Sequence, residues 1–212
     1  MEDPVRRNRK ETERKLIRAV GEVFRAQGYT GLGINKVARQ AGVQKTLIYR
    51  YFGNVEQLFK TYLLEQDYWS SYQNNLNNIL EENQEDYGKS LAKNVLKKQL
   101  DYFYSNEEMH QVIRWEISEK NEISRGISDA RERMGEEMLS LTDAYFKDTG
   151  VNFRALLALQ IAGIYYFVLH AKVNGSTFCG IDISKESDMK ELHRTLTQVV
   201  DWSYEKAAKK MA

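Results

Sequence analysis

The chain contains 212 residues, of which 42% are hydrophobic and 29% are charged, so it is long enough for a small domain followed by a larger one. Its single cysteine, Cys179, excludes an intrachain disulfide. The first residues lack the apolar run of a signal peptide, and the longest apolar run, 155–169, is shorter than the roughly 20 residues that cross a bilayer. We therefore expect a cytoplasmic protein with no membrane partner.

Charge is distributed unevenly along the chain. Residues 1–60 hold 13 Lys and Arg against 6 Asp and Glu, whereas residues 61–212 hold 18 against 24. The two parts therefore carry net charges of +7 and −6. A basic head on an acidic body is typical of a nucleic-acid-binding protein, because DNA phosphates attract the head and repel the body.

Apolar residues recur at helical spacing along most of the chain, and strand-like alternation is scarce. The sequence therefore predicts an all-α fold with about nine helices. The first predicted helix, 6–27, has one apolar stripe, formed by Leu16, Ile17, Val20, Val23 and Phe24. Its other face is basic. Such a face is commonly only solvated, but the motif that follows favours contact with phosphates.

The next segment, 34–59, has the pattern of a helix-turn-helix. The apolar pattern of one short helix stops at Gly42, where a tight turn needs a positive φ, and resumes at Val43. A small residue, Ala38, lies where the two helices must come close. We expect the two helices over about 34–40 and 44–52.

The second of these helices is the expected DNA-recognition helix. Its exposed face combines cationic, hydroxyl and aromatic side chains, which can contact phosphates and base edges in the major groove of double-stranded DNA. The predicted DNA-binding residues are Asn35, Gln44, Lys45, Thr46, Leu47, Tyr49, Arg50 and Tyr51.

Residues 10–59 resemble the DNA-binding domain of the tetracycline-repressor (TetR) family of bacterial transcriptional regulators. The family pattern is present, in order and spacing, in the segments Gly28-Tyr29, Val37-Ala38, Ala41-Gly42-Val43, Tyr49-Arg50-Tyr51-Phe52 and Glu56-Gln57-Leu58. The resemblance implies a three-helix DNA-binding domain over 1–53, followed by a larger helical effector-binding and dimerisation domain over 54–212.

Four positions differ from the residues that are usual in the family. Val55 replaces a lysine at the start of the fourth helix, so a phosphate contact is expected to be missing there. Gly33 and Gln44 replace Thr and Ser N-caps, so weaker caps are expected. Leu47, where Thr is frequent, suits a thymine methyl group.

The remaining sequence predicts a helical body. One long helix is expected over 54–83, and amphipathic helices follow around 91–103, 107–120 and 122–147. Segment 153–173 is apolar nearly all round, so it must be covered by the core on one side and by a partner on the other. The last helix is expected from about Ser184.

The resemblance implies that the last two helices pair with their copies in a homodimer. The predicted interface residues are Leu157, Ile161, Ile164, Val168, Leu192, Leu196, Val199 and Val200. A two-fold dimer places two recognition helices about 34–36 Å apart, which implies a pseudo-palindromic operator.

The resemblance also implies a small-molecule effector site in the body. Residues 61–212 hold 18 aromatic residues against 6 in residues 1–60, and Tyr and Trp combine apolar surface with a polar tip. For any single aromatic residue, packing is the commoner role. The candidate pocket residues are Trp69, Tyr102, His110, Trp115, Met134, Met138, Tyr165 and Tyr166.

The sequence holds no motif for catalysis or metal binding. Its three histidines are scattered, and it lacks a Cys-x-x-Cys pair, a nucleophile elbow and a phosphate-binding glycine loop. We expect no enzyme activity, catalytic residue, cofactor or metal. The predicted function is transcriptional regulation, as a repressor that a small, largely apolar ligand releases from DNA. The alternative is a TetR-like protein whose acidic body binds a protein partner in an architectural or cell-division role.

Overall fold

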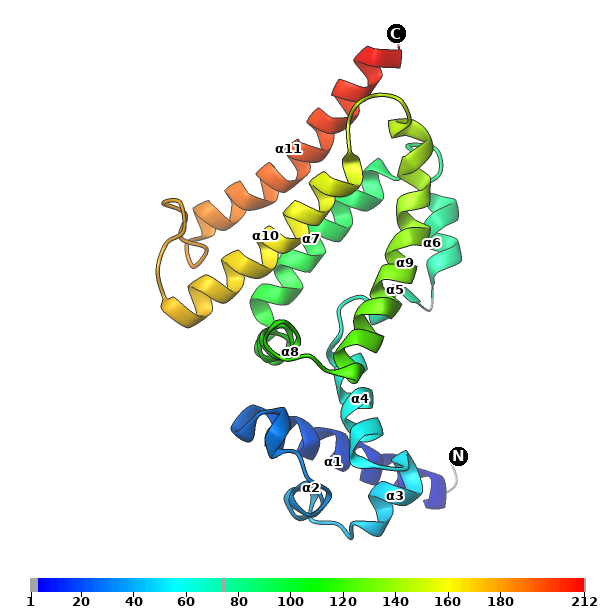
Figure 1. The fold of residues 1–212 in the computed structure, drawn as a ribbon, viewed down its shortest axis with the longest axis vertical. Helices are drawn as coiled ribbons and strands as arrows, with labels where there is room; N and C mark the ends of the chain where they lie inside the picture. The colour runs from blue at the N-terminus through cyan, green and yellow to red at the C-terminus, as the bar shows by residue number, and fades with distance from the viewer. Residues whose placement is uncertain (1–3, 74, 212) are drawn as a thin grey trace. The chain divides into compact units, whose positions relative to one another are not determined.

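The computed structural model describes residues 4–73 and 75–211, and its regular elements in these ranges are helices (Figure 1). The prediction of an all-α fold is confirmed. The elements are α1 Pro4–Gln27, the 3-10 turn η1 Tyr29–Gly31, α2 Ile34–Ala41, α3 Thr46–Phe52, α4 Val55–Gln66, α5 Ser70–Gln73, α6 Leu76–Glu82, α7 Lys89–Ser105, α8 Glu107–Ser118, α9 Glu122–Phe146, α10 Phe153–Asn174 and α11 Glu186–Met211.

The chain divides into two compact units. Unit 1 contains residues up to Ser70 together with Glu108–Ser128, and unit 2 contains Ser71–Glu107 and the residues from Asp129 onward. By packing, α4 and nearly all of α8 therefore group with the first three helices. The division at 53/54, which separates the expected DNA-binding and effector-binding functions, remains a prediction.

The long helix expected over 54–83 is wrong, because the chain forms α4, α5 and α6 there instead. Helix α4 ends at Gln66, and Asp67 takes an extended conformation with φ −77° and ψ 118°. The carbonyl of Asp67 accepts a hydrogen bond from the Ser70 backbone N–H at 3.2 Å, and its carboxylate accepts one from the Ser70 hydroxyl at 3.4 Å. An aspartate that bonds to local groups in this way competes with continuation of the helix.

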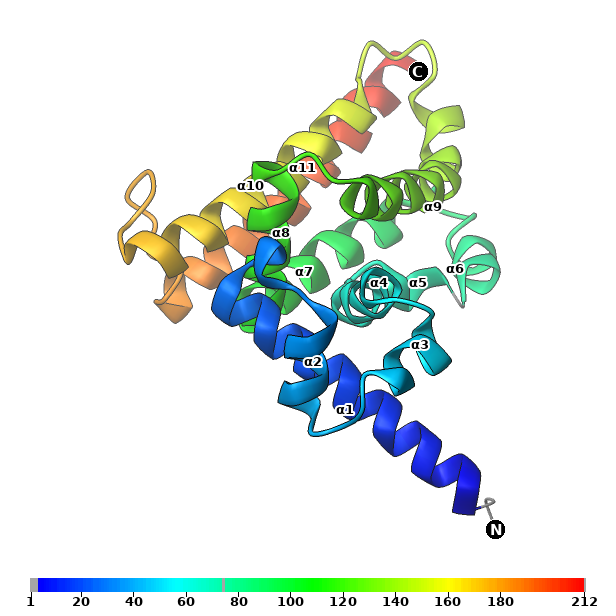
Figure 2. The ribbon, with the colours of Figure 1, turned by 60° about the horizontal axis from the view of Figure 1, so that its bottom comes forward.

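Helices α1 to α4 share an apolar core in unit 1, and Figure 2 shows α2 and α3 beside α1 and α4. The fully buried side chains include Leu16 and Val20 of α1, Ile48 of α3 and Leu58 of α4. A Cβ atom at Gly21 would lie 2.4 Å from the Tyr62 ring, so glycine is what lets α1 and α4 approach this closely. This contact sets how α4 crosses the first helix.

Helix α8 completes the core of unit 1 although it lies far along the sequence. The Trp115 ring packs against Phe24, Tyr29 and Phe59 at centroid distances of 6.0, 5.1 and 5.4 Å, and only 6% of Trp115 is exposed. The Glu108 carboxylate forms an ion pair with Arg25 and also accepts a hydrogen bond from the Tyr62 hydroxyl at 3.1 Å. A segment beyond residue 107 is therefore part of the core beneath the helix-turn-helix.

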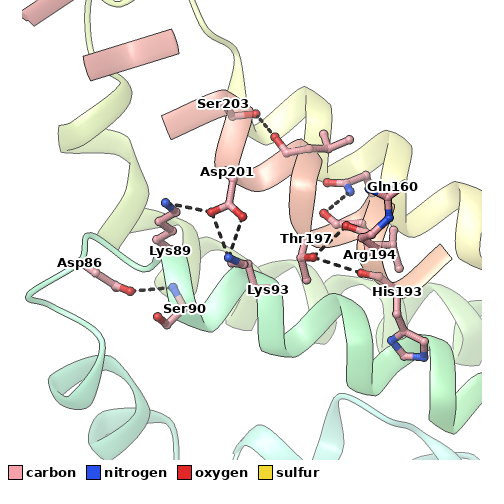
Figure 3. Close-up of polar contacts among 12 residues, drawn as sticks. Asp86, Lys89, Ser90, Lys93, Gln160, His193, Arg194, Thr197, Asp201 and Ser203 are labelled. Atoms are coloured by element: carbon pink, nitrogen blue, oxygen red, sulfur yellow. Dashed lines mark hydrogen bonds and ion pairs between the residues drawn. The ribbon is translucent and has the colours of Figure 1, made fainter. Parts of the chain in front are cut away.

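In unit 2, α10 and α11 both pack on α7. The Lys89 and Lys93 ammonium groups lie 2.9 and 2.8 Å from the Asp201 carboxylate, and these contacts join α7 to α11 (Figure 3). The hydrogen bond from Lys93, assisted by Lys89, holds the pKa of Asp201 below its ordinary value. The Gln160 amide of α10 also donates to the Leu196 carbonyl of α11 at 2.9 Å (Figure 3).

Candidate nucleic-acid interface

The turn between α2 and α3 has the geometry that the sequence predicts. Gly42 adopts φ 67° and ψ 32°, a left-handed conformation that favours glycine, and the Val43 backbone N–H donates to the Ala38 carbonyl at 3.0 Å. Val37 is fully buried, as is Ile48 of α3. These contacts hold the two helices in a fixed arrangement on α1 and α4.

Both helices lack a side-chain cap, but the N-cap of α3 is Lys45 and not the expected Gln44. Neither Gly33, at the N-cap of α2, nor Lys45, at the N-cap of α3, makes a side-chain capping bond. Helix α3 begins at Thr46 rather than near Gln44, because the carbonyls of Gln44 and Lys45 accept turn-type bonds from the backbone of Leu47 and Ile48 at 3.0 and 3.1 Å. The first turn of α3 therefore has no side-chain cap.

Most of the predicted DNA-binding side chains are exposed together on α3 and the turn before it. Gln44, Lys45 and Thr46 make no side-chain hydrogen bond or ion pair within the described part of the chain. Leu47 and Tyr51 are half-buried, and 55% of Tyr49 is exposed. The exposed residues of the predicted set are Asn35, Gln44, Lys45, Thr46, Tyr49 and Arg50.

Two other polar groups near this surface have structural partners. The Lys36 ammonium donates to the Gln27 side chain at 2.7 Å and to the Gly31 carbonyl at 3.1 Å, so it links α2 to the loop before it. The Asn54 side chain accepts from the Gln57 backbone N–H at 2.8 Å and caps α4. The first turn of α4 carries Val55 and Glu56, so it offers no cation to a phosphate.

The candidate effector residues are divided between the two units. Trp69, His110 and Trp115 belong to unit 1, where His110 is buried and Trp115 is part of the aromatic core. In unit 2, the Tyr165 ring packs on Phe103 at 4.8 Å. Of the other candidates there, Met134 and Met138 are buried, Tyr102 is half-buried and Tyr166 is 53% exposed.

Two open depressions lie on unit 2, with volumes of about 440 and 370 Å³. The first is lined partly by Phe146, Phe153 and Arg154, and the second partly by Tyr104 and His193. Neither is lined by a candidate effector residue, so the location of the effector site remains a prediction. In the ranges that the structure describes, no cluster of His, Cys, Asp and Glu is placed to hold a metal ion.

The candidate dimer residues also differ in exposure. Ile164, Val168 and Val200 are at most 4% exposed within the single chain, so they belong to the core of unit 2 and offer no surface to a partner. The other five, Leu157, Ile161, Leu192, Leu196 and Val199, are half-buried.

A different set of apolar residues on α10 is more exposed. Leu159, Tyr166 and Val173 are 71%, 53% and 57% exposed, and their spacing of seven residues places them on one face. By length and composition alone, α10 could cross a membrane, and only 11% of its apolar window is buried. An apolar helix with so little cover needs a partner surface.

Residues 16–62 match the profile of the bacterial regulatory proteins of the tetR family. These residues therefore form a TetR-family DNA-binding domain. Such a domain is that of DNA-binding transcriptional regulators rather than of enzymes, and its helix-turn-helix is formed by α2 and α3. None of the curated proteins matches the sequence.

Solved structures share the fold of this chain over most of its length. A Clostridium perfringens protein whose proposed role is regulation of fatty acid metabolism has a TM-score of 0.64 and 18% identity, covering 87% of this chain and 97% of that chain. FadR from Bacillus subtilis, solved in complex with stearoyl-CoA, has a TM-score of 0.54 and 19% identity, with coverages of 88% and 96%. The fatty acid degradation regulator FadR from Bacillus halodurans has a TM-score of 0.57 and 15% identity, covering 93% of this chain and 96% of that chain.

Lys45→Ala is expected to weaken DNA binding equally for all sequences, because an unpaired exposed lysine at the start of α3 is suited to a phosphate. The slope of log K against log salt should fall by about one per protomer. Leu47→Ala is the matched comparison, and it should instead relax the preference at one base pair. Fluorescence anisotropy with a panel of single-base variants measures both effects. An unchanged affinity for Lys45→Ala would remove this residue from the interface.

Proposed function

We propose that this chain is a homodimeric repressor that a small, largely apolar ligand releases from a pseudo-palindromic operator in the bacterial cytoplasm. The first ligand to test is a long-chain acyl-CoA. The observation that carries the proposal is a TetR helix-turn-helix joined to a body whose fold is shared with FadR of Bacillus subtilis, solved with stearoyl-CoA. An identity of 19% supports a shared fold alone, so the ligand class is part of the proposal and is tested below.

The homodimer is supported by the exposed apolar face of α10. Leu159, Tyr166 and Val173 form a stripe along this helix, and Trp202 of α11 is also 56% exposed. The same face of a second copy can cover this stripe, because a two-fold axis brings identical surfaces of the two protomers together. Two protomers then present two α3 helices to one face of the DNA, at a distance of about one helical turn.

Coupling between ligand and DNA is supported by the path of the chain. Helix α8 and the first residues of α9 belong to unit 1, whereas the rest of α9 belongs to unit 2. Through Glu108 and Trp115, a shift of α8 acts directly on α1 and α4. A ligand shifts the equilibrium between the DNA-binding and the released state only by its difference in affinity for the two, typically about 1–3 kcal/mol. We therefore expect the ligand to raise the dissociation constant for DNA by roughly 5- to 150-fold.

The proposal is tested by adding stearoyl-CoA to the full-length protein bound to a duplex that it has selected from a random pool. We expect the dissociation constant for DNA to rise within the range given above, and coenzyme A without the acyl chain to have no effect. If no acyl-CoA changes DNA binding, an acyl-CoA effector is excluded. Genomic binding at many dispersed sites, rather than at a few operators, would favour a body that binds a protein partner.

A further inference from the structure

The N-terminal turns of α1 extend beyond the core of unit 1. None of residues 8–15 is buried, and the first fully buried residue of the helix is Leu16. Arg9 lies seven residues before Leu16 and therefore on the same face of the helix. The face of α1 that carries Leu16 is therefore apolar in the core of unit 1 and carries the charged Arg9 near the N-terminus of the helix, beside α3.

At this position, Arg9 meets the recognition helix. Its guanidinium carbon lies 5.2 Å from the centroid of the Tyr51 ring, and the guanidinium carbon of Arg50 lies 6.0 Å from the same centroid. Arg9 Nε donates to the Glu13 carboxylate at 2.8 Å, which holds the side chain towards α3. The Arg9 side chain remains 58% exposed, so its terminal nitrogens are available to an anion.

The charges around the Tyr51 ring are unbalanced. Two guanidinium groups approach the ring, and Glu13 is the carboxylate bonded to one of them. A phosphate is a suitable counter-charge, because guanidinium groups match its geometry with two parallel hydrogen bonds and stay charged at all relevant pH values. An anion at this corner would relieve the repulsion between the two arginines.

The usual family anchor on the neighbouring helix is missing. Helix α4 begins with Val55, its first turn carries Glu56, and its cap residue Asn54 uses its side chain to bond the Gln57 backbone. A phosphate near α3 therefore finds no cation at the start of α4. Beside the Tyr51 ring of α3, the fold places the guanidinium groups of Arg9 and Arg50.

We propose that Arg9 of α1 is a DNA-contacting residue, which with Arg50 binds one backbone phosphate at the edge of the segment recognised by α3. This inference rests on DNA binding by the helix-turn-helix, and it adds a residue from outside that motif. The partner is the phosphate backbone of double-stranded DNA. The contact carries no sequence preference of its own, but it sets the register in which α3 lies in the major groove.

The test compares Arg9→Ala with Lys15→Ala in the full-length protein. Lys15 is a matched control, because it lies in the same helix, is 54% exposed and forms an i,i+4 ion pair with Glu11 at 2.9 Å. It lies roughly 120° around the helix axis from Arg9. Both variants lose one positive charge, so a difference between them reports a local contact rather than a general attraction.

The probe is a duplex selected by the wild-type protein from a random 30-base-pair pool, and binding is followed by anisotropy at several KCl concentrations. For Arg9→Ala we expect roughly tenfold weaker binding per protomer and a salt slope smaller by about 0.9 per protomer. Lys15→Ala should leave the slope unchanged. Equal affinities and slopes for the two variants, with unchanged circular dichroism, would overturn the assignment of Arg9.

A second measurement identifies the phosphate. Single phosphates of the duplex are replaced in turn by neutral methylphosphonates. At one position in each half-site, we expect the replacement to weaken DNA binding by the wild-type protein more than binding by Arg9→Ala, in which only Arg50 still contacts that phosphate. If Arg9→Ala responds like the wild type at every position, Arg9 contacts no phosphate. If the wild-type protein selects no duplex, DNA binding itself fails, and the inference fails with it.

Discussion

Replacing Trp115 by alanine is expected to destabilise unit 1 by about 3–5 kcal/mol, the usual cost of removing a large aromatic side chain from a packed core. Trp115 is 6% exposed and lies against Phe24, Tyr29 and Phe59. Its removal leaves a cavity beneath α1 and α4, the helices that support α2 and α3. Because unit 1 would be partly unfolded, DNA binding should be lost, although Trp115 is far from the helix-turn-helix in sequence.

The measurement is urea unfolding followed by circular dichroism, at one fixed protein concentration because a dimer links stability to concentration. Ile117→Ala is the control on the same helix, since Ile117 is 75% exposed, and it should change stability by less than about 0.5 kcal/mol. A Trp115→Ala protein that is as stable as the wild type and binds DNA normally would show that α8 is not part of the core of the DNA-binding unit.

Leu159→Glu is expected to convert the protein to a monomer at micromolar concentration. Leu159 is 71% exposed at the N-terminal end of the apolar stripe of α10, and two-fold symmetry would bury two added carboxylates in one interface. An unpaired buried charge costs about 3–5 kcal/mol. Since a monomer contacts only one half-site, DNA affinity should fall by more than about 100-fold.

The control for this variant is Asn94→Glu, which adds the same charge at an exposed position of α7. Light scattering coupled to size-exclusion chromatography gives the mass of each protein in solution. We expect a monomer for Leu159→Glu and a dimer for both the control and the wild type. A dimeric Leu159→Glu protein would show that the exposed face of α10 is not the dimer interface.

The helix-turn-helix could be predicted from sequence because its determinants are local. The apolar spacing around Val37 and the glycine at 42 specify a short helix and a tight turn whatever lies elsewhere, and Gly42 has the expected positive φ. The break after Gln66 cannot be predicted from the spacing of apolar residues, because that spacing continues across it. It depends on hydrogen bonds between Asp67 and Ser70, which the apolar pattern does not report.

Contacts between distant segments could not be predicted from one sequence. Trp115 was a candidate pocket residue because a buried aromatic residue has the same signature in a pocket and in a core, and its packing on Phe24 depends on how α8 folds back. Arg9 is one of several basic residues in the first helix, and the sequence does not distinguish it from the others. Its distance from Tyr51 singles it out, and that distance is a property of the fold.

The dimer surface shows a similar ambiguity. The apolar pattern of α10 runs nearly all round the helix, so sequence could not separate Val168, which is fully buried in unit 2, from Leu159, which is exposed. The direction in which α10 packs on α7 makes that distinction. The structure therefore moves the proposed interface to the stripe that contains Leu159, Tyr166 and Val173.

The measurement that tests the account most directly is the reciprocal coupling between DNA and acyl-CoA. The dissociation constant for stearoyl-CoA is measured by titration calorimetry with the free protein and with the protein saturated by its selected duplex, and the constant for DNA is measured with and without stearoyl-CoA. Linkage requires the same factor in both directions, and we expect roughly 5- to 150-fold. Stearoyl-CoA that binds equally well to free and DNA-bound protein would contradict its role as the effector.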